Sequence, residues 1–319
     1  MRIGQNPAKS VETVPQPADI TVTVVNCLPF LSGFYAQSLE VLKACLYSLR
    51  QNTDQPFDLM VFDNHSCQEV RQFLVQAQEQ GVIQYLILSD KNIGKIGAWN
   101  YMFGAAQGRM VAFCDSDIYF RPGWLEASLE LFQTFPNVGM VTSRPLRTPM
   151  EFSSATLKWG EQQPPGVLTK GTFLDWDTYI EHTNSIGMPI EKSRDEYEQG
   201  NDYLLTQDES RAYAGAAHFQ FVARKEVLQR IIPLPSVKPM RGERALDIAI
   251  NDLGYLRLCT EKALVSHYGN RLPESLSTAP PFSGNIKPVI MRLIWAPGIR
   301  HVLMWLYNRI FKLFFENVK

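Results

Sequence analysis

The chain has 319 residues, of which 45% are hydrophobic and 20% are charged, and its formal net charge at pH 7 is −1. This composition is typical of a globular protein with a large apolar core, and the balanced charge excludes a protein that binds nucleic acid through a general positive field. The five cysteines show no Cys-x-x-Cys spacing, which indicates reduced thiols in a cytoplasmic protein and excludes a zinc site or a disulfide framework.

Residues 1–19 form a polar N-terminal segment that contains three prolines. The segment lacks the apolar stretch of a secretory signal, so we expect a disordered lead-in. No run of about 18 uncharged apolar residues occurs in the chain, and no membrane-spanning helix is therefore expected.

Strand-like and helix-like segments alternate from residue 20 to about residue 148. Runs of β-branched and apolar residues predict strands, and apolar residues three or four positions apart predict helices. Strands are expected at 20–25, 57–62, 83–88 and 110–114, and helices at 38–51, 68–80 and 98–106. This alternation predicts an α/β fold with a mainly parallel sheet flanked by helices.

Polar residues follow the predicted strands where each strand ends. Asn26, Asp63 and Asn92 come after the first three strands, and Asp115 and Asp117 come after the fourth. Because parallel strands bring their carboxyl ends to one edge of the sheet, we expect these side chains to converge there.

Asp115 and Asp117 lie one residue apart, and two carboxylates at that spacing repel each other unless a cation lies between them. Divalent cations favour carboxylate oxygens together with substrate phosphates, so this pair predicts a site for Mg²⁺ or Mn²⁺. Gly94 and Gly97 predict a turn whose backbone could approach a diphosphate closely.

The second half of the chain shows weaker patterns. Residues 149–207 are polar and aromatic without clear periodicity, which predicts long functional loops or disorder. Residues 211–222 predict a strand, 224–232 a short helix, and 244–253 a helix that stops at Gly254. Short strands are expected at 256–259 and 263–265, followed by His267.

Taken together, the motifs over residues 20–270 resemble those of the inverting glycosyltransferases of family 2, which have the Rossmann-like GT-A fold. The matching pieces are Val61-Phe-Asp-Asn-His-Ser66, Asn92-x-Gly-x-x-x-Ala-x-Asn100, Cys114-Asp-Ser-Asp117, and Glu243 eleven residues before Gly254-Tyr, with His267 beyond them. Each motif is weak alone, and their order and spacing together carry the resemblance.

The resemblance implies a donor site in residues 20–148. Asp63 would contact the nucleotide base, Asp115 the ribose and the metal, and Asp117 the metal, with His267 as a further ligand. The residues that would shape the nucleotide pocket are Asn26, Asn92, Gly94 and Asn100. The donor implied most strongly is a UDP-sugar, and a dTDP-sugar or a GDP-sugar is the alternative.

The resemblance also implies an acceptor-binding and catalytic half in residues 149–280, with a saccharide or lipid-linked acceptor and Glu243 as general base. The family usually has a Glu-Asp pair there, whereas this chain reads Gly242-Glu243-Arg244, which keeps a carboxylate at the base position but moves it by about one methylene. Asp247, one helical turn on, is the alternative base. A second interpretation of the whole chain is a non-catalytic nucleotide- or sugar-binding module of the same fold.

Residues 281–319 form a basic amphipathic tail with six Lys or Arg and one Glu. Large apolar residues recur at helical spacing in 286–319, and Pro297-Gly298 divides this stretch into two expected helices. Such a tail predicts peripheral contact with the inner face of a membrane. The alternative is packing on the catalytic domain or on a second subunit in a homo-oligomer.

Overall fold

The computed structural model describes residues 6–237 and 242–273, together with helical residues Trp305, Leu306 and Arg309. The chain divides into two units, Met1–Leu272 and Pro273–Lys319, and the first contains the sheet and the helices that flank it. The two helices expected in the C-terminal tail, and their membrane or subunit contact, lie outside the described residues apart from those three. No helix in the described part of the chain is long and apolar enough to cross a membrane.

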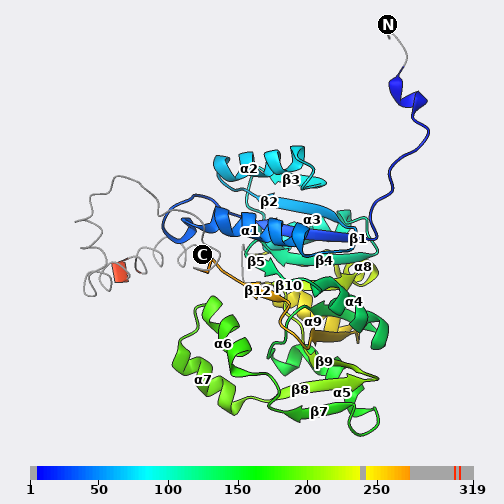
Figure 1. Ribbon diagram of the computed structural model, residues 1–319, viewed down its shortest axis with the longest axis vertical. Coiled ribbons are helices and arrows are strands. Elements are labelled where there is room, and N and C mark those ends of the chain that lie inside the picture. The colour runs from blue at the N-terminus through cyan, green and yellow to red at the C-terminus, as the bar shows by residue number, and fades with distance from the viewer. Residues whose placement is uncertain (1–5, 238–241, 274–304, 307–308, 310–319) are drawn as a thin grey trace. The chain divides into compact units, whose positions relative to one another are not determined.

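In the described chain a ten-stranded sheet has the order β3-β2-β1-β4-β10-β6-β11-β9-β8-β7 (Figure 1). Seven of the ten strands point the same way, and only β10, β9 and β7 run against them, which confirms the expected mainly parallel sheet. A separate pair joins β5 (Ile118–Phe120) to β12 (Val265–His267). The strands of the main sheet are β1 (Ile20–Asn26), β2 (Asp58–Asn64), β3 (Tyr85–Ser89), β4 (Met110–Asp115), β6 (Val138–Thr142), β7 (Leu168–Gly171), β8 (Asp202–Gln207), β9 (Ser210–Ala214), β10 (Gln220–Arg224) and β11 (Leu256–Thr260).

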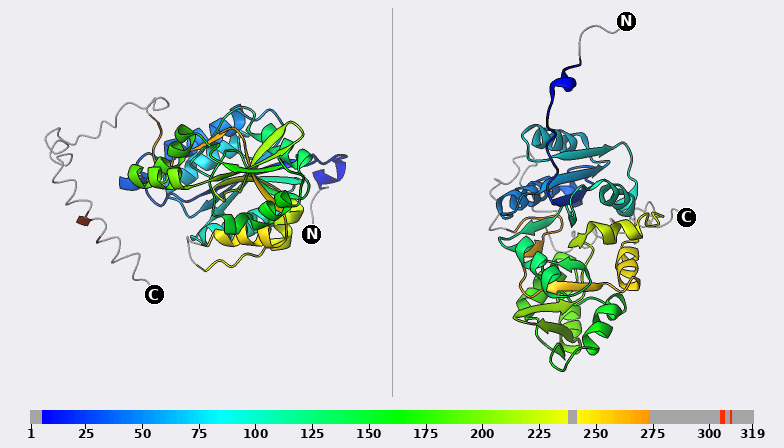
Figure 2. Two further views of the ribbon diagram at one scale, coloured as in Figure 1. Left: turned by 90° about the horizontal axis from the view of Figure 1, so that it is seen from below. Right: turned by 90° about the vertical axis from the view of Figure 1, so that its right-hand side faces the viewer.

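Helices cover both faces of this sheet (Figure 2). Helix α1 shows why: Val41, Leu42, Cys45, Leu46 and Leu49 repeat every three or four residues and are all buried against the sheet. The α-helices are α1 (Ser38–Gln51), α2 (Gln68–Glu79), α3 (Gly94–Ala105), α4 (Trp124–Thr134), α5 (Ser154–Glu161), α6 (Trp176–Ser185), α7 (Ile190–Gln199), α8 (Lys225–Ile231) and α9 (Arg244–Asp252). Short 3-10 turns are η1 (Pro7–Ser10), η2 (Gly33–Tyr35) and η3 (Met150–Ser153).

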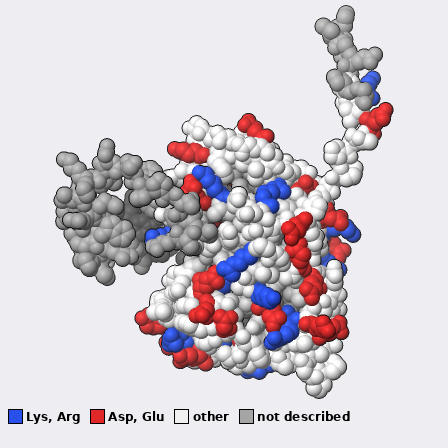
Figure 3. Space-filling view, viewed as in Figure 1, with Lys and Arg blue, Asp and Glu red and all other residues white. Residues whose placement is uncertain are grey.

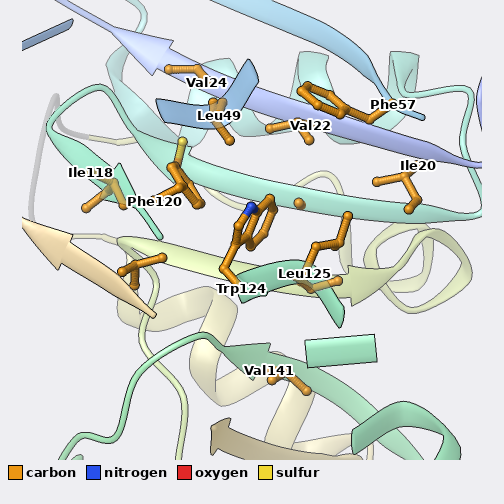
Figure 4. Close-up of a cluster of buried hydrophobic side chains, with 14 of the residues drawn as sticks. Ile20, Val22, Val24, Leu49, Phe57, Ile118, Phe120, Trp124, Leu125 and Val141 are labelled. Atoms are coloured by element: carbon orange, nitrogen blue, oxygen red, sulfur yellow. The ribbon is translucent and has the colours of Figure 1, made fainter. Parts of the chain in front are cut away.

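Apolar side chains on the two faces of the sheet form two buried clusters. On one face, Val22 of β1, Leu49 of α1 and Trp124 of α4 point toward one another (Figure 4). On the other face, Phe113 of β4 packs with Trp99 of α3. Because β1 is buried on both sides, its sequence reads as a continuous apolar and β-branched run.

The expectation of loops or disorder for residues 149–207 was wrong, since this segment contains α5, β7, α6, α7 and β8. Helices α6 and α7, at the lower left of Figure 1, bury only three of their side chains, which explains the missing hydrophobic period. Aromatic and arginine contacts join these elements instead: the guanidinium of Arg147 lies 4.7 Å from the ring centre of Tyr197, and Arg194 lies 4.7 Å from that of Trp176.

The single strand expected at 211–222 was also wrong. The chain forms β9 and β10 there, and β11 and β6 lie between them in the sheet. The crossing is made by residues 215–219, which begin with Gly215 at φ 126°, a conformation that favours glycine. This loop carries two residues of the candidate site.

Acidic and basic side chains are interspersed over the face of the described chain that Figure 3 shows. That face therefore carries no extended field of one sign, in agreement with the net charge of −1.

Candidate active site

The carboxyl ends of β1 and β2 carry a buried polar network. Asn26 Nδ2 donates to Asp63 Oδ1 at 3.1 Å and to Ser66 Oγ at 2.9 Å, and the Ser66 amide donates to Asp63 Oδ2 at 3.2 Å. Asp63 is fully buried, and Arg71 Nε lies 3.6 Å from its Oδ2. Asn26 Oδ1 is buried and has no hydrogen-bond partner among the described residues. The structure thus brings Asn26 and Asp63 together and leaves one acceptor oxygen open.

Asn92 lies beside this network at the start of α3. Its Oδ1 accepts from Asn64 Nδ2 at 2.9 Å and from the amide of Gly94 at 2.8 Å. Gly94 has φ 77° and is the first residue of α3, so the helix begins four residues before the sequence indicated. The turn expected from Gly94 and Gly97 was therefore wrong: Gly97 is inside the helix, where a Cβ would lie 3.1 Å from the Ile93 side chain.

Asn100, on the same helix as Gly94, makes its hydrogen bonds to a different part of the chain from the other predicted donor residues. Its Nδ2 donates to the main-chain oxygen of Leu234 at 2.9 Å, and its Oδ1 accepts from the Leu234 amide at 2.8 Å. Both ends of the side-chain amide are therefore used to join α3 to the segment after α8. These contacts connect two parts of the fold, and the nucleotide-binding role expected for Asn100 stays a prediction.

Asp115 ends β4 next to a lysine that the sequence patterns did not single out. Lys95 Nζ, from the first turn of α3, lies 2.6 Å from Asp115 Oδ2. Burial raises the pKa of the Asp115 carboxyl, Lys95 opposes that rise, and the nearby charge of Asp117 adds to it. The lysine falls inside the Asn92–Asn100 motif, so its position in the motif was the available signal.

Asp117 and His267 meet because β5 pairs with β12, which places His267 opposite Ile118. His267 Nε2 lies 3.3 Å from Asp117 Oδ2, and His267 Nδ1 lies 3.0 Å from Ser185 Oγ. Burial alone would lower the pKa of His267, but the hydrogen bond to Asp117 and the charges of Asp117 and Asp115 outweigh it and raise the pKa. Asp117 Oδ1 is buried and unpaired within the described chain.

His182 of α6 completes this group and was missed from the sequence, because it falls in the segment expected to form loops. Its ring stacks on Phe219 with centroids 5.1 Å apart and lies 6.3 Å from the ring of His267. Burial, helped by the charges of Arg144 and His267, lowers the pKa of His182 to about 3. Its Nδ1 is buried and has no partner in the part of the chain that the structure describes. We call Asp117, His182 and His267 the Asp117 cluster.

The fit of this edge to a divalent cation depends on how many ligands the protein supplies. Within residues 6–237 and 242–273, no group of three or more His, Cys, Asp or Glu is arranged to hold a metal ion. Asp117 nevertheless keeps a buried, unpaired carboxylate oxygen beside His267. Mg²⁺ usually takes only one or two carboxylates and fills its other positions with water and substrate phosphates. The residues therefore fit a cation that arrives with a diphosphate.

The two acids expected as bases lie at α9. Glu243 is the residue before the helix, is partly exposed, and its carboxylate has no partner among the residues described. Gly242 packs against Ile96 of α3, which brings this end of α9 next to the start of α3. Arg244 is exposed, with its guanidinium 5.8 Å from the ring centre of Phe152.

Asp247 differs from Glu243 because it is only 4% exposed and both of its oxygens are engaged. Oδ1 pairs with Arg257, which is 1% exposed, and Oδ2 lies 2.9 Å from His218 Nδ1. Because neither oxygen is left for an acceptor hydroxyl, these contacts favour Glu243 over Asp247 as the base, and the choice between the two stays a prediction. We call His218, Asp247 and Arg257 the Asp247 cluster.

A cavity of about 680 Å³ lies at the opposite, amino edge of the sheet, where β1 and β4 begin and β10 ends. Four of its charged side chains form two ion pairs, Arg109 with Asp19 and Arg224 with Glu226. It holds none of the strand-end residues, so we place the candidate site at the carboxyl edge.

A family profile and a curated protein both match this chain in sequence. The profile described as Glycosyl transferase family 2 matches residues 34–214. A curated protein of Nostoc sp. strain PCC 7120, named as an uncharacterized glycosyltransferase, is 32% identical over 100 residues, which are 31% of each chain.

Solved structures of similar fold include TarS residues 1–349 of S. aureus in complex with UDP-GlcNAc, at 15% identity and TM-score 0.47, covering 82% of this chain and 62% of that one. A mannosyltransferase of Pyrobaculum calidifontis in complex with GDP-Man and Mn²⁺ has 14% identity and TM-score 0.46, covering 79% of this chain and 58% of its own. The chain thus spans about a third of the curated relative and about three fifths of these solved chains.

Proposed function

We propose that this chain, which belongs to glycosyltransferase family 2 and is a sugar-transferring enzyme, is a metal-dependent inverting transferase. In this proposal a sugar moves from a nucleoside diphosphate to an acceptor hydroxyl. The donor favoured is a UDP-sugar, and the acceptor is a saccharide or a lipid-linked saccharide bound by residues 149–280.

The observation that carries the proposal is the unpaired Oδ1 of Asp117. A buried carboxylate oxygen without a partner costs free energy unless a ligand satisfies it. The other oxygen of this carboxylate lies 3.3 Å from His267 Nε2, at the strand ends where α/β proteins bind ligands. Mg²⁺ or Mn²⁺ held there by Asp117 and His267 would neutralise charge on the leaving diphosphate.

The donor nucleotide has a matching site at β1 and β2. Asn26 Oδ1 is a buried acceptor without a partner among the described residues, and a base N–H can donate to it. Both oxygens of Asp63 have partners, so Asp63 would act on the base through Asn26, which it holds in place by the 3.1 Å hydrogen bond. Asn92 and Gly94 shape the neighbouring wall, and Asp115 with Lys95 would lie toward the ribose and phosphates.

The transfer itself is one in-line displacement. The acceptor oxygen bonds to the anomeric carbon on the face opposite the diphosphate, so the configuration inverts as the bond to the diphosphate oxygen breaks. The acceptor proton must pass to a base within hydrogen-bond reach. Of the two acids expected from the sequence, Glu243 alone keeps a carboxylate without a partner in the described chain.

The test is turnover of nucleotide-sugars by the full chain with Mn²⁺ or Mg²⁺, measured as release of nucleoside diphosphate and as transfer of labelled sugar to saccharide acceptors. We expect release with at least one UDP-sugar, and almost none from Asp117→Asn, which keeps the side-chain shape. Binding of a nucleotide-sugar without any release, with every acceptor class tried, would favour the non-catalytic binding module instead.

We propose separately that residues 286–319 contact an anionic membrane surface and present a lipid-linked acceptor. Flotation with liposomes containing anionic lipid should recover the full chain and lose a chain ending at residue 280. Equal flotation of both chains would contradict membrane contact and favour packing of the tail on a second subunit. Sedimentation would detect that packing as a homo-oligomer.

A further inference from the structure

A histidine that no sequence motif indicated lies beside the candidate site. His218 is in the loop 215–219 between β9 and β10, and its Nδ1 lies 2.9 Å from Asp247 Oδ2. The other oxygen of Asp247 pairs with the buried guanidinium of Arg257. Arg257 also donates to the main-chain oxygens of Phe152 and Ala216, so its position is fixed from three directions.

This arrangement determines which nitrogen of His218 can accept a proton. In this inference the Asp247 carboxylate, which already accepts from Arg257, also accepts from His218, so Nδ1 carries the hydrogen and Nε2 keeps its lone pair. Nε2 has no partner in the described chain, and the side chain is 35% exposed. A histidine held in one tautomer by a carboxylate, with the far nitrogen open, is arranged to take a proton.

The same loop is attached to the proposed donor site. The residue after His218, Phe219, accepts a hydrogen bond from the amide of Asp115 at 2.8 Å through its main-chain oxygen. The ring centroid of His218 lies 6.5 Å from that of Trp99, and Lys95 Nζ, which binds Asp115, lies 5.3 Å from the same Trp99 ring. The charged groups around His218 are therefore Asp247 and Arg257 on one side and Lys95 across Trp99.

Glu243 is the rival for the role of base, and it differs from His218 in how it is held. No group in the described chain orients the Glu243 carboxylate, which lies at the partly exposed start of α9. His218 is oriented by Asp247, which is itself fixed by Arg257. A base that is already oriented needs no rearrangement before it takes the proton, which favours His218.

We propose that His218 is the catalytic base of the transfer, and that Asp247 and Arg257 position it. The inference deepens the proposed function and rests on it. As the acceptor oxygen bonds to the anomeric carbon, its proton passes to His218 Nε2, and the diphosphate leaves with the electron pair of the broken bond. The imidazolium, stabilised by Asp247, then returns its proton to water. Glu243 stands at the base position that the family resemblance implies, so it is the direct rival of His218 for this role.

The central experiment compares His218→Gln with Glu243→Gln in the full chain, using the nucleotide-sugar and acceptor that the wild type turns over. We expect His218→Gln to lower kcat by about 10²- to 10⁴-fold, the usual contribution of a general base, with the Kd for UDP and Mn²⁺ unchanged within about twofold. Glu243→Gln should lower kcat by roughly tenfold or less, because His218 still accepts the proton of the acceptor hydroxyl. The reverse pattern, with His218→Gln nearly as active as wild type, would overturn the inference.

Chemical rescue separates a catalytic role from a structural one. Added imidazole should restore turnover to His218→Ala and should do nothing for Glu243→Gln. No rescue in a His218→Ala chain that keeps its wild-type Tm and UDP affinity would count against His218. A wild-type chain that releases no nucleotide from any donor would overturn the proposed function and this inference together.

A third measurement does not depend on turnover. Nitrogen-15 NMR of labelled histidine should show His218 with its hydrogen on Nδ1 at pH 8, and Asp247→Asn should change that tautomer. A hydrogen on Nε2 in the wild type would contradict the role, because Nε2 could then not accept the acceptor proton.

Discussion

Two clusters of acids and histidines meet at the loop 215–219, and they differ in how completely their polar atoms are paired. In the Asp247 cluster, both carboxylate oxygens and one histidine nitrogen have protein partners. In the Asp117 cluster, Asp117 Oδ1 and His182 Nδ1 are buried without partners in the described chain.

The difference indicates that the two clusters have different roles, one in positioning a neighbouring side chain and one in binding a ligand. A buried carboxylate with every oxygen paired is held rigidly and can orient a neighbour, but it has nothing left for a ligand. A buried carboxylate with one open oxygen is incomplete until something binds, which suits a cation and a diphosphate. Substitutions in the two clusters should therefore have different consequences for stability and for turnover.

Breaking the Asp247 cluster should cost the most stability. Arg257→Met leaves the Asp247 charge buried with only His218 as partner, and such a change typically costs about 3–5 kcal/mol of unfolding free energy. Urea unfolding of the wild type and the variant at pH 7.5 measures it. The double variant Arg257→Met with Asp247→Leu should recover most of the loss, and a loss below about 1 kcal/mol in the single variant would contradict the distinction.

Removing the open carboxylate should affect function and leave stability unchanged. We expect Asp117→Ala to lower kcat by about 10²- to 10³-fold, the scale for removing one group that stabilises transferred charge, and to abolish the Mn²⁺ dependence of UDP binding. Its Tm should match that of the wild type, because the loss of the 3.3 Å contact with His267 is offset by removal of the unpaired buried oxygen. A fall in Tm as large as that of Arg257→Met would mean that both clusters are structural.

The unpaired histidine of the Asp117 cluster, His182, should also make the unfolding free energy depend on pH. The pKa of His182 is about 3 in the folded chain and 6.5 when exposed, so the unfolded state binds the proton more readily. The stability from neutral His182 is present above pH 6.5 and is lost as the pH falls, by about 2 kcal/mol at pH 5. The variant His182→Phe can keep the stacking on Phe219. Between pH 7.5 and pH 5 its unfolding free energy should fall by about 2 kcal/mol less than that of the wild type, and an equal fall in both proteins would contradict the assignment.

Asn100 serves as a control outside both clusters. Asn100→Ala removes two hydrogen bonds to the Leu234 main chain and should lower the unfolding free energy by about 1–2 kcal/mol. Its Kd for UDP, measured by calorimetry, should stay within about twofold of the wild type. A tenfold weaker Kd with unchanged stability would return Asn100 to the nucleotide pocket.

The sequence was sufficient to predict the parallel half of the sheet, because buried parallel strands read as continuous apolar runs that end in polar residues. Asn26, Asp63 and Asp115 fall at those ends in the structure. The meeting of Asp117 with His267 depends on the pairing of β5 with β12, two three-residue strands without a pattern of their own, and it was expected only from the family resemblance.

The residues that were missed depend on contacts distant in sequence. Lys95 could be read only as part of a motif until α3 was seen to begin at Gly94. His182 lies in a helix held by aromatic and arginine contacts, which leave no hydrophobic period. His218 reads as one more residue of a strand, and its role depends on Asp247, 29 residues later.

The central claim is that a nucleoside diphosphate and its cation bind beside Asp117 at the carboxyl end of β4. Crystals of the full chain grown with UDP and Mn²⁺ test it, because anomalous diffraction near the manganese edge locates the cation and the electron density locates the UDP. The account predicts a manganese peak bonded to the Asp117 carboxylate, with the diphosphate on its far side and the uracil at Asn26. UDP in the cavity at the amino edge, between Arg109 and Arg224, would contradict it.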